Sequence, residues 1–298
     1  MSHIPVLLNE IIDHLHLEAG DIVVDGTLGE GGHSQKICEF IGQTGTLVGI
    51  DMDSTAIARA KKKLAECEAK QILIKGNFRQ LDELISSAGI GKVSAVLLDL
   101  GVNSSQLDDD ERGFTFRTDK PLIMTLDDSP DEEKTTAYDV VNSWEEKNLA
   151  DIIYGFGEER LSRQIAKAIC QARQKAPIKT TAQLVSIIEN AVPAWYRKGK
   201  IHPATRTFQA IRIAVNDELG ALADGLESAW RSLDKGGRLA VISFHSLEAR
   251  IVKNFFKDKK DSGEGELVTK RVVKPTREET LSNPRSRSAQ LRVITKII

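Results

Sequence analysis

Short apolar runs alternate with amphipathic stretches along the first hundred residues of the chain. Four mostly apolar runs have the length of strands buried on both faces: Ile22 to Asp25, Thr46 to Asp51, Gln71 to Ile74 and Val93 to Leu98. Three stretches between them have helical periodicity: Ser34 to Ile41, Ser54 to Cys67 with Ser54 as N-cap, and Leu81 to Ala88. This alternation predicts a parallel, right-handed, doubly wound α/β sheet.

The pattern changes after residue 107. Residues 108–203 predict amphipathic helices without convincing strands, broken at Pro177 and Pro193. One or two helices are expected from Thr207 to Leu233, ending at Gly236-Gly237, before a strand from Leu239 to Phe244. A helix from Leu247 to Phe256 and strands from Leu267 to Val273 and Leu291 to Ile297 follow.

The strand that starts at Leu239 should lie beside the strand that ends at Asp99, roughly 140 residues earlier, at the ligand crevice of such a sheet. A helical module is therefore inserted at the edge of that crevice, which favours a large substrate. We expect a sheet domain built from residues 1–107 and 204–298, and an inserted helical domain of residues 108–203.

Composition is that of a soluble globular protein, with 41% hydrophobic and 28% charged residues among 298. Cys38, Cys67 and Cys170 lie far apart without a C-x-x-C pair, so we expect reduced core thiols. Six scattered histidines without an H-x-x-x-H arrangement predict no metal site. The N-terminus lacks the pattern of a signal peptide and no stretch approaches 18 apolar residues, which favours a cytoplasmic protein that does not bind membranes.

The loop from Asp25 to Ser34, with the sequence DGTLGEGGHS, carries the first candidate chemistry. Its glycines let the backbone turn sharply and approach a ligand, and the helix that follows points its N–H groups at the same place. The spacing is not G-x-G-x-x-G and an acid ends the strand, which favours S-adenosylmethionine over NAD. Taken alone, such a loop is equally compatible with a plain structural turn.

Three further strand ends add to the cofactor prediction. Asp51 closes the second strand, where a carboxylate can accept hydrogen bonds from ribose hydroxyls. Phe78 follows the third strand and offers a ring to adenine, although a core position explains it equally well. Asp99 closes the fourth strand, and the polar loop after it can bond an incoming amine.

Several blocks of the sequence resemble signatures of the bacterial small-subunit ribosomal RNA methyltransferase H family, also called MraW. They run nearly from end to end of the chain: residues 3–10 (HIPVLLNE), the loop 25–34, 99–108 continuing through 111–114, 157–160 (GEER), 202–210 (HPATRTFQA), 243–248 (SFHSLE) and 283–288 (NPRSRS). The resemblance implies a class I (Rossmann-like) methyltransferase sheet with an inserted helical domain. It also implies S-adenosylmethionine-dependent N4-methylation of a cytidine in the decoding centre of 16S rRNA, in the cytoplasm.

By matching position, the resemblance implies seven cofactor contacts: Gly31, Gly32, His33, Asp51, Phe78, Asp99 and Gln106. His33 and Gln106 come from the resemblance alone, since a histidine that opens a helix is more often a local cap. Asp99 is the expected catalytic residue. With a neighbouring backbone carbonyl it would accept the two hydrogens of the cytosine amine, so that the nitrogen lone pair faces the methyl group in line.

The chain departs from the family pattern at a few positions. Asn103-Ser104-Ser105-Gln106 stands for Ser-Ser-Pro-Gln, and Ala249 stands where an aspartate is usual. Ile123 and Thr125 lie in a block, residues 120–127, from which an acid and an arginine of the family are missing. These departures bear on substrate affinity, because the cofactor loop is unchanged.

Candidates for contact with RNA follow from charge and from the resemblance. Acids dominate between Asp108 and Glu159 and bases dominate after Arg250, so one pole of the molecule could hold phosphates. The substrate-binding candidates are Arg206, His245, Arg285 and Arg287. A structural histidine and a solvated basic loop explain His245 and the last two arginines equally well. Residues 195–200, with the sequence WYRKGK, could stack and pair with RNA or simply end a helix.

The expected partner is 16S rRNA within the small ribosomal subunit, with an accessible cytidine, and the chain could form a homodimer. DNA is not expected, because a DNA amino-methyltransferase would carry an Asn/Asp-Pro-Pro-Tyr/Phe block where Leu100-Gly101-Val102 stands. The glycine spacing argues against a dinucleotide oxidoreductase. A non-catalytic RNA-binding or assembly factor is the third alternative, and it would transfer no methyl group.

Overall fold

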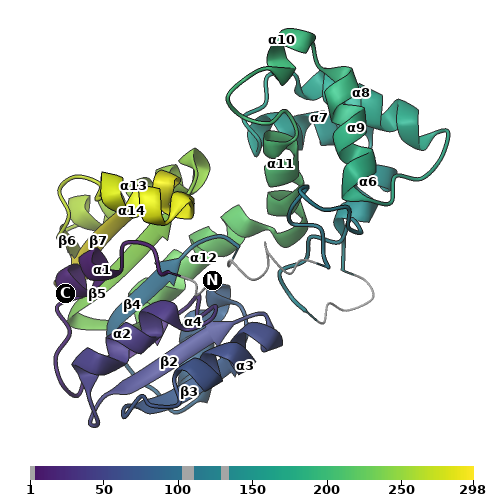
Figure 1. Cartoon of the computed structure of the whole chain (residues 1–298). Coiled ribbons are helices and arrows are strands. Elements are labelled where there is room, and N and C mark those ends of the chain that lie inside the picture. The colour runs from purple at the N-terminus through teal and green to yellow at the C-terminus, as the bar shows by residue number, and fades with distance from the viewer. Residues whose placement is uncertain (1–3, 103–110, 129–133) are drawn as a thin grey trace. The chain divides into compact units, whose positions relative to one another are not determined.

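The computed structural model describes residues 4–102, 111–128 and 134–298, and the chain folds into two compact units (Figure 1). The sheet unit contains Met1–Gly101 and Leu219–Ile298. The helical unit contains Val102–Glu218. The sequence places the corresponding domain boundaries at residues 107 and 203.

The sheet unit is built on a seven-stranded sheet with the order β3-β2-β1-β4-β5-β7-β6. Its strands are β1 (Ile22–Asp25), β2 (Thr46–Asp51), β3 (Lys70–Lys75), β4 (Val93–Asp99), β5 (Leu233–Ser243), β6 (Gly265–Leu267) and β7 (Gln290–Lys296). Strands β1 to β5 are parallel, and β7 runs antiparallel to both β5 and β6. Asp99 of β4 lies opposite Ile242 of β5, which confirms that strands far apart in the sequence are neighbours. The predicted α/β fold class is confirmed.

Helices cover both faces of this sheet because successive residues of each buried strand point to opposite sides. Val23 packs in one core with α1 (Leu8–Leu15), α2 (Gly32–Ile41) and α3 (Ser54–Lys63), whereas Val24 packs in the other. The second core involves α4 (Leu81–Ser87), α12 (Glu218–Ser232) and α13 (Ser246–Asp261). The shorter elements are η1 (Phe78–Gln80), α14 (Arg277–Ser282) and η2 (Pro284–Ser288).

Several predicted element ends differ from the structure, and hydrogen bonds or strand pairing account for three of them. The N-cap of α3 is Asp53 rather than Ser54, because its carboxylate accepts hydrogen bonds from the backbone N–H groups of Thr55 and Ala56. Strand β5 starts at Leu233 and runs through the two glycines predicted as a stop. The strand predicted from Leu267 to Val273 overlaps β6 only at Leu267, since beyond this residue the Thr269 hydroxyl accepts the N–H of Val293 in place of a backbone carbonyl.

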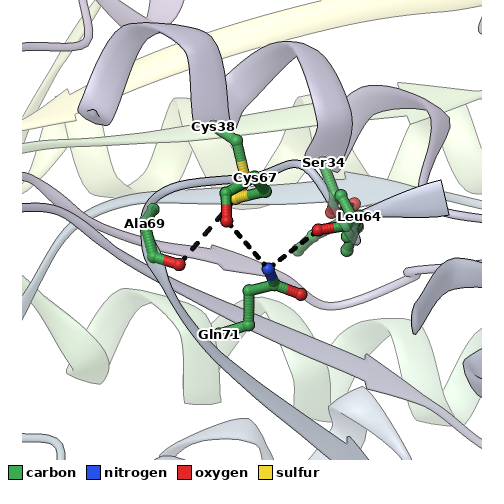
Figure 2. Close-up of a disulfide and its surroundings, with 7 residues drawn as sticks. Ser34, Cys38, Leu64, Cys67, Ala69 and Gln71 are labelled. Atoms are coloured by element: carbon green, nitrogen blue, oxygen red, sulfur yellow. Dashed lines mark hydrogen bonds between the residues drawn. A yellow bond between two sulfur atoms is a disulfide. The ribbon is translucent and has the colours of Figure 1, made fainter. Parts of the chain in front are cut away.

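The prediction of reduced thiols is also wrong for two of the three cysteines. Cys38 of α2 and Cys67, between α3 and β3, form a disulfide (Figure 2). Cys170 is free and buried. The pair lies 29 positions apart in the sequence, but packing on one face of the sheet brings their Cα atoms to 5.7 Å. The side-chain amide of Gln71 donates to the carbonyls of Leu64, at 2.9 Å, and Cys67, at 3.2 Å, and so holds the turn that carries the second cysteine.

The helical unit has a core of its own. Among its described residues the helices are α6 (Ala137–Ser143), α7 (Glu146–Gly155), α8 (Ser162–Arg173), α9 (Thr181–Ala191), α10 (Ala194–Arg197) and α11 (Thr205–Asn216). Phe208 and Ile211 of α11 are buried in the same core as α6 to α9, which explains why the unit extends to Glu218. The chain leaves α11 through Asp217, whose φ of 46° is left-handed. Within the described part of the chain, no helix combines the length and apolarity that crossing a membrane requires.

Candidate active site

Acidic side chains end β1, β2 and β4, on the edge of the sheet where the strand order reverses between β1 and β4. Ligands of doubly wound sheets bind at this edge, outside the carboxyl ends of the strands. Asp25, Asp51 and Asp99 all lie in the sheet unit, so the sheet brings these three predicted groups to one edge.

Asp25 holds the glycine loop together. Its Oδ1 accepts the N–H of Thr27 at 3.2 Å, and its Oδ2 accepts the hydroxyl of Ser34 at 2.6 Å, so one carboxyl group ties the two ends of the loop. The side chain is buried, and this burial raises its pKa from 3.8 to about 6 despite both hydrogen bonds. The strand-end acid is therefore a structural element of the loop.

The glycines of the loop allow close packing as well as a sharp turn. Gly31 has a left-handed φ of 76°, and a Cβ there would meet Ala60 of α3 at 3.2 Å. A Cβ on Gly32 would lie 2.7 Å from Cγ of Pro5, in the N-terminal segment. Neighbouring residues of the chain therefore leave no room for a side chain at either position. The N-terminal segment lies directly against the loop.

Asp51 is placed at the end of β2 as predicted, with both oxygens bonded to backbone. Oδ2 accepts the N–H of Gly29 at 2.8 Å and Oδ1 accepts the N–H of Asp53 at 2.9 Å. Burial, the largest cause, raises its pKa to about 6. Each carboxylate oxygen can accept more than one hydrogen bond, so the group can still receive ribose hydroxyls.

Phe78 begins η1 directly after β3 and is half-buried. The ring packs against α12, because a Cβ built on Gly225 would lie 2.3 Å from its Cδ2. Its Cβ lies close to Gly26, where an added Cβ would be 3.3 Å away from it. The side chain is thus part of the core and still borders the glycine loop.

Asp99 ends β4 beside the start of the loop. Its backbone N–H donates to the hydroxyl of Thr27 at 2.6 Å, a contact that explains why threonine stands where such loops often have glycine. Oδ1 is buried, and within the described ranges no hydrogen-bond partner reaches it. Oδ2 lies 3.6 Å from Nδ1 of His33. Burial, followed by the charges of Asp25 and Glu248, raises the pKa of Asp99 well above its usual value.

His33 is buried at the start of α2. Its second ring nitrogen, Nε2, lies 2.9 Å from the carbonyl oxygen of Val6. Burial is the main reason that its pKa falls to about 4, and Lys63 adds to this effect. No role for Val6 was predicted from the sequence, since no spacing rule links it to His33 or to the strand ends.

The predicted substrate-binding residues fall in different parts of the chain. His245 caps α13, with Nδ1 accepting the N–H of Glu248 at 3.5 Å, so it has a structural role as well. Arg285 and Arg287 are exposed in η2 of the sheet unit. Arg206 belongs to the helical unit, where it donates to the carbonyl of Glu158 at 3.2 Å. Gln106 lies outside the described residues.

Comparison with known proteins identifies the family. The family model described as "MraW methylase family" matches residues 1–297. A Deinococcus radiodurans protein named ribosomal RNA small subunit methyltransferase H is 50% identical over 98% of this chain and 89% of its own length. Proteins of the same name from Persephonella marina and a Paenibacillus species are 45% and 43% identical, over 100% and 99% of this chain and 100% and 99% of theirs.

A crystal structure of an rRNA methylase from Streptococcus thermophilus covers the whole of both chains at 11% identity with a TM-score of 0.47, a likeness too weak to carry weight. The assignment therefore depends on the family match and on the sequence relatives, which extend over nearly the entire chain. The chain belongs to the MraW methylase family and is an S-adenosylmethionine-dependent methyltransferase.

Proposed function

We propose that this enzyme methylates the N4 amine of a cytidine in the decoding centre of 16S rRNA. The observation that carries the proposal is the match, from end to end and at 41–50% identity, to proteins named ribosomal RNA small subunit methyltransferase H. The choice of N4 is supported by the chemistry of the site, where Oδ1 of Asp99 has no hydrogen-bond partner among the described residues and could accept a hydrogen bond from an N–H donor.

The residues at the strand ends suit the cofactor. S-adenosylmethionine supplies a methyl group activated by the positive charge on its sulfur. We assign Asp51 to its ribose, Phe78 to its adenine, and Gly31, Gly32 and His33 to the loop that borders it, with Asp99 beside the reacting atoms. Gln106 is assigned to the same set by its position in the sequence.

Asp99 is the proposed catalytic residue. The cytosine amine is a weak nucleophile because its lone pair is delocalised into the ring, so the enzyme must orient that lone pair towards the methyl group. A hydrogen bond from the amine to Oδ1 of Asp99 would favour a tetrahedral nitrogen and would satisfy a buried atom that has no partner among the described residues. This step needs no metal ligand from the chain.

Arg206, His245, Arg285 and Arg287 are proposed to contact the RNA. Arginines bind phosphate oxygens through charge-assisted hydrogen bonds, and Arg285 and Arg287 are exposed two positions apart in η2. The acceptor we propose is 16S rRNA within the small ribosomal subunit, in the cytoplasm, since a target base in a decoding centre must be unpaired or splayed out to enter a site. A homodimer is a further expectation, which sedimentation of the purified protein would test.

Methyl transfer from labelled S-adenosylmethionine to isolated small subunits tests this function directly. We expect one labelled cytidine in 16S rRNA, located by base-resolved mapping and absent from the rRNA of cells that lack the protein. Label on another base, on carbon or on a ribose would contradict the N4 proposal, and binding to subunits without any transfer would indicate an assembly factor. Naked 16S rRNA in parallel reactions would show whether the assembled particle is required.

A substitution at Asp99 tests its proposed catalytic role. Asp99→Ala should lower kcat by about 10² to 10⁴-fold, the usual range for a group that handles a proton in the transition state. Asp234→Ala removes an exposed carboxylate of the same sheet unit and serves as the matched control, with activity unchanged. A near-normal kcat for Asp99→Ala would rule out the catalytic role, whatever the identity of the methylated base.

A further inference from the structure

A chain of three groups runs through the sheet unit from the N-terminal segment to the catalytic carboxyl. The carbonyl oxygen of Val6 lies 2.9 Å from Nε2 of His33, and Nδ1 on the other side of the same ring lies 3.6 Å from Oδ2 of Asp99. The histidine ring therefore bridges a backbone carbonyl and the group proposed to receive the substrate amine. Its fraction of exposed surface is only 6%.

The Val6 carbonyl fixes the tautomer of His33. A carbonyl oxygen only accepts hydrogen bonds, so Nε2 must carry the ring hydrogen in order to donate to it. The low pKa of His33, about 4 because of its burial, keeps the ring neutral near pH 7. A neutral ring with its hydrogen on Nε2 has only a lone pair at Nδ1, and this lone pair faces Oδ2 of Asp99.

The backbone that presents this carbonyl is held in an unusual conformation. Leu7, directly after Val6, has a left-handed φ of 53° although it is not glycine, and it is fully buried. Its N–H donates to Oε1 of Glu279 in α14 at 2.8 Å, and Asn283 donates to the carbonyl of Ile4 at 3.0 Å. Residues held in sparsely populated conformations cluster at functional sites, where surrounding contacts impose them.

The carboxyl of Asp99 has two oxygens in different surroundings. Oδ2 faces the acceptor Nδ1, whereas Oδ1 is buried without a partner within the described residues. Burial and the charges of Asp25 and Glu248 raise the pKa of this group well above its usual value, which favours the protonated carboxyl, and Oδ2 is the oxygen with an acceptor in front of it. Oδ1 is then left as a free acceptor. The 3.6 Å separation is longer than a hydrogen bond, as catalytic pairs often are before substrate binds.

We propose that His33 is a positioning residue that acts through Asp99, taking the Oδ2 proton at Nδ1 while Oδ1 takes the proton that the methylated amine releases. The proposal rests on the proposed function and adds to it the path of the proton. One N–H bond of the amine breaks and one O–H bond forms at Oδ1, while the O–H bond at Oδ2 breaks and an N–H bond forms at Nδ1. The positive charge of the amine thus ends on the imidazole ring, and the reverse transfer releases the proton to water after the base leaves.

Three charged groups face this pair and set its proton affinity. Lys63, at the end of α3, disfavours a charge on His33, whereas Asp25 of β1 and Glu248 of α13 disfavour the ionised form of Asp99. The imidazolium that forms would be stabilised by Asp99 on one side and by the Val6 carbonyl on the other.

The first test needs neither cofactor nor RNA. Nitrogen-15 NMR of the ring nitrogens distinguishes a protonated nitrogen from one with a lone pair, and the His33 signals can be assigned by their loss in His33→Gln. We expect hydrogen on Nε2 and none on Nδ1 near pH 7. A hydrogen on Nδ1 would overturn the proposal, because the ring could then accept nothing from Asp99.

The second test uses His33→Gln, whose amide can still donate to Val6 and accept from Asp99 but cannot become a cation. With small subunits as substrate, kcat should fall about 100-fold. The kcat of the wild type should stay level between about pH 6 and 9, whereas that of the variant should rise with pH, because Asp99 must then be ionised before it can take a proton. The Kd for S-adenosylmethionine should rise by a smaller factor than kcat falls, because His33 borders the cofactor in the proposed site but its proton transfer belongs to the chemical step.

His14→Gln, the same substitution in α1, is the matched control and should leave kcat and its pH profile unchanged. Thermal unfolding of both variants checks that the fold is kept. If His33→Gln retains a level profile and a wild-type kcat, or loses cofactor affinity alone, the relay is wrong while the proposed function stands. If the wild type transfers no methyl group to rRNA, the proposed function fails, and the NMR result still decides the tautomer.

Discussion

The disulfide between Cys38 and Cys67 leads to a prediction with a calculable size. The bond closes a loop of 29 positions that contains β2 and α3, so it restricts the unfolded chain much more than the folded one. The chain-entropy relation for a loop of this length gives about 12 cal/mol/K, or about 3.6 kcal/mol at 25 °C. Reduction should lower the free energy of unfolding of the sheet unit by roughly that amount.

The expected change is large enough to measure simply. For a unit of this size, each kcal/mol corresponds to about 2–4 °C in Tm, so the double variant Cys38→Ala/Cys67→Ala should melt about 7–14 °C below the oxidised protein. Cys170→Ala is the matched control, because that thiol is free and lies in the helical unit. The double variant should also lose the sensitivity of Tm to reductant that the wild type has.

Counting thiols tests the premise itself. Alkylation of the unfolded, unreduced protein should modify one cysteine per chain, and prior reduction should raise the number to three. Three modified cysteines without reduction would show that the bond does not form in the isolated protein. An oxidised protein whose Tm does not respond to reductant would instead refute the entropy argument.

Two further substitutions test the site and its supports. Gly225→Ala should lower the free energy of unfolding by about 1–3 kcal/mol and weaken binding of S-adenosylmethionine, because the new Cβ would lie 2.3 Å from Cδ2 of Phe78. The control is Gly155→Ala, where nothing lies within 4 Å of the new Cβ, and it should be neutral or stabilising. Equal melting temperatures for the two variants would contradict the predicted clash. The pKa of Asp25 is raised from 3.8 to about 6 in the fold, so the folded state keeps a proton that the unfolded chain releases, and stability should decline as pH rises from about 4 to about 6. Asp25→Asn should remove up to about 3 kcal/mol of this decline in urea titrations, and an unchanged slope would show that the carboxyl is not responsible.

The sheet was predictable because its central strands are buried on both faces. Continuous apolar runs then mark the strands, and β1 and β2 have the predicted first and last residues. At the sheet edge this signal fails. β6 is short because the Thr269 side chain replaces a backbone acceptor, a choice that depends on a neighbouring strand far along the chain.

The acids of the site were predictable for the same reason, since Asp25, Asp51 and Asp99 follow recognisable strands. Their hydrogen-bond partners were not. Thr27 bonds to Asp99 across 72 positions and Leu7 bonds to Glu279 across 272, and only the fold brings such residues together. The block at residues 3–10 stood out in the sequence, but nothing in it indicated that a backbone carbonyl would face His33.

The separation of β4 from β5 in the chain has a consequence for synthesis on the ribosome. Asp99 lies opposite Ile242, so the parallel edge of β4 can find its partner only after the whole helical unit has been translated. At about 5–20 residues per second, this leaves the nascent half-sheet with an unpaired central edge for roughly 7–28 s. Such an edge is a template for intermolecular pairing, so chains that stall within the insertion should be prone to aggregate and should depend on chaperones.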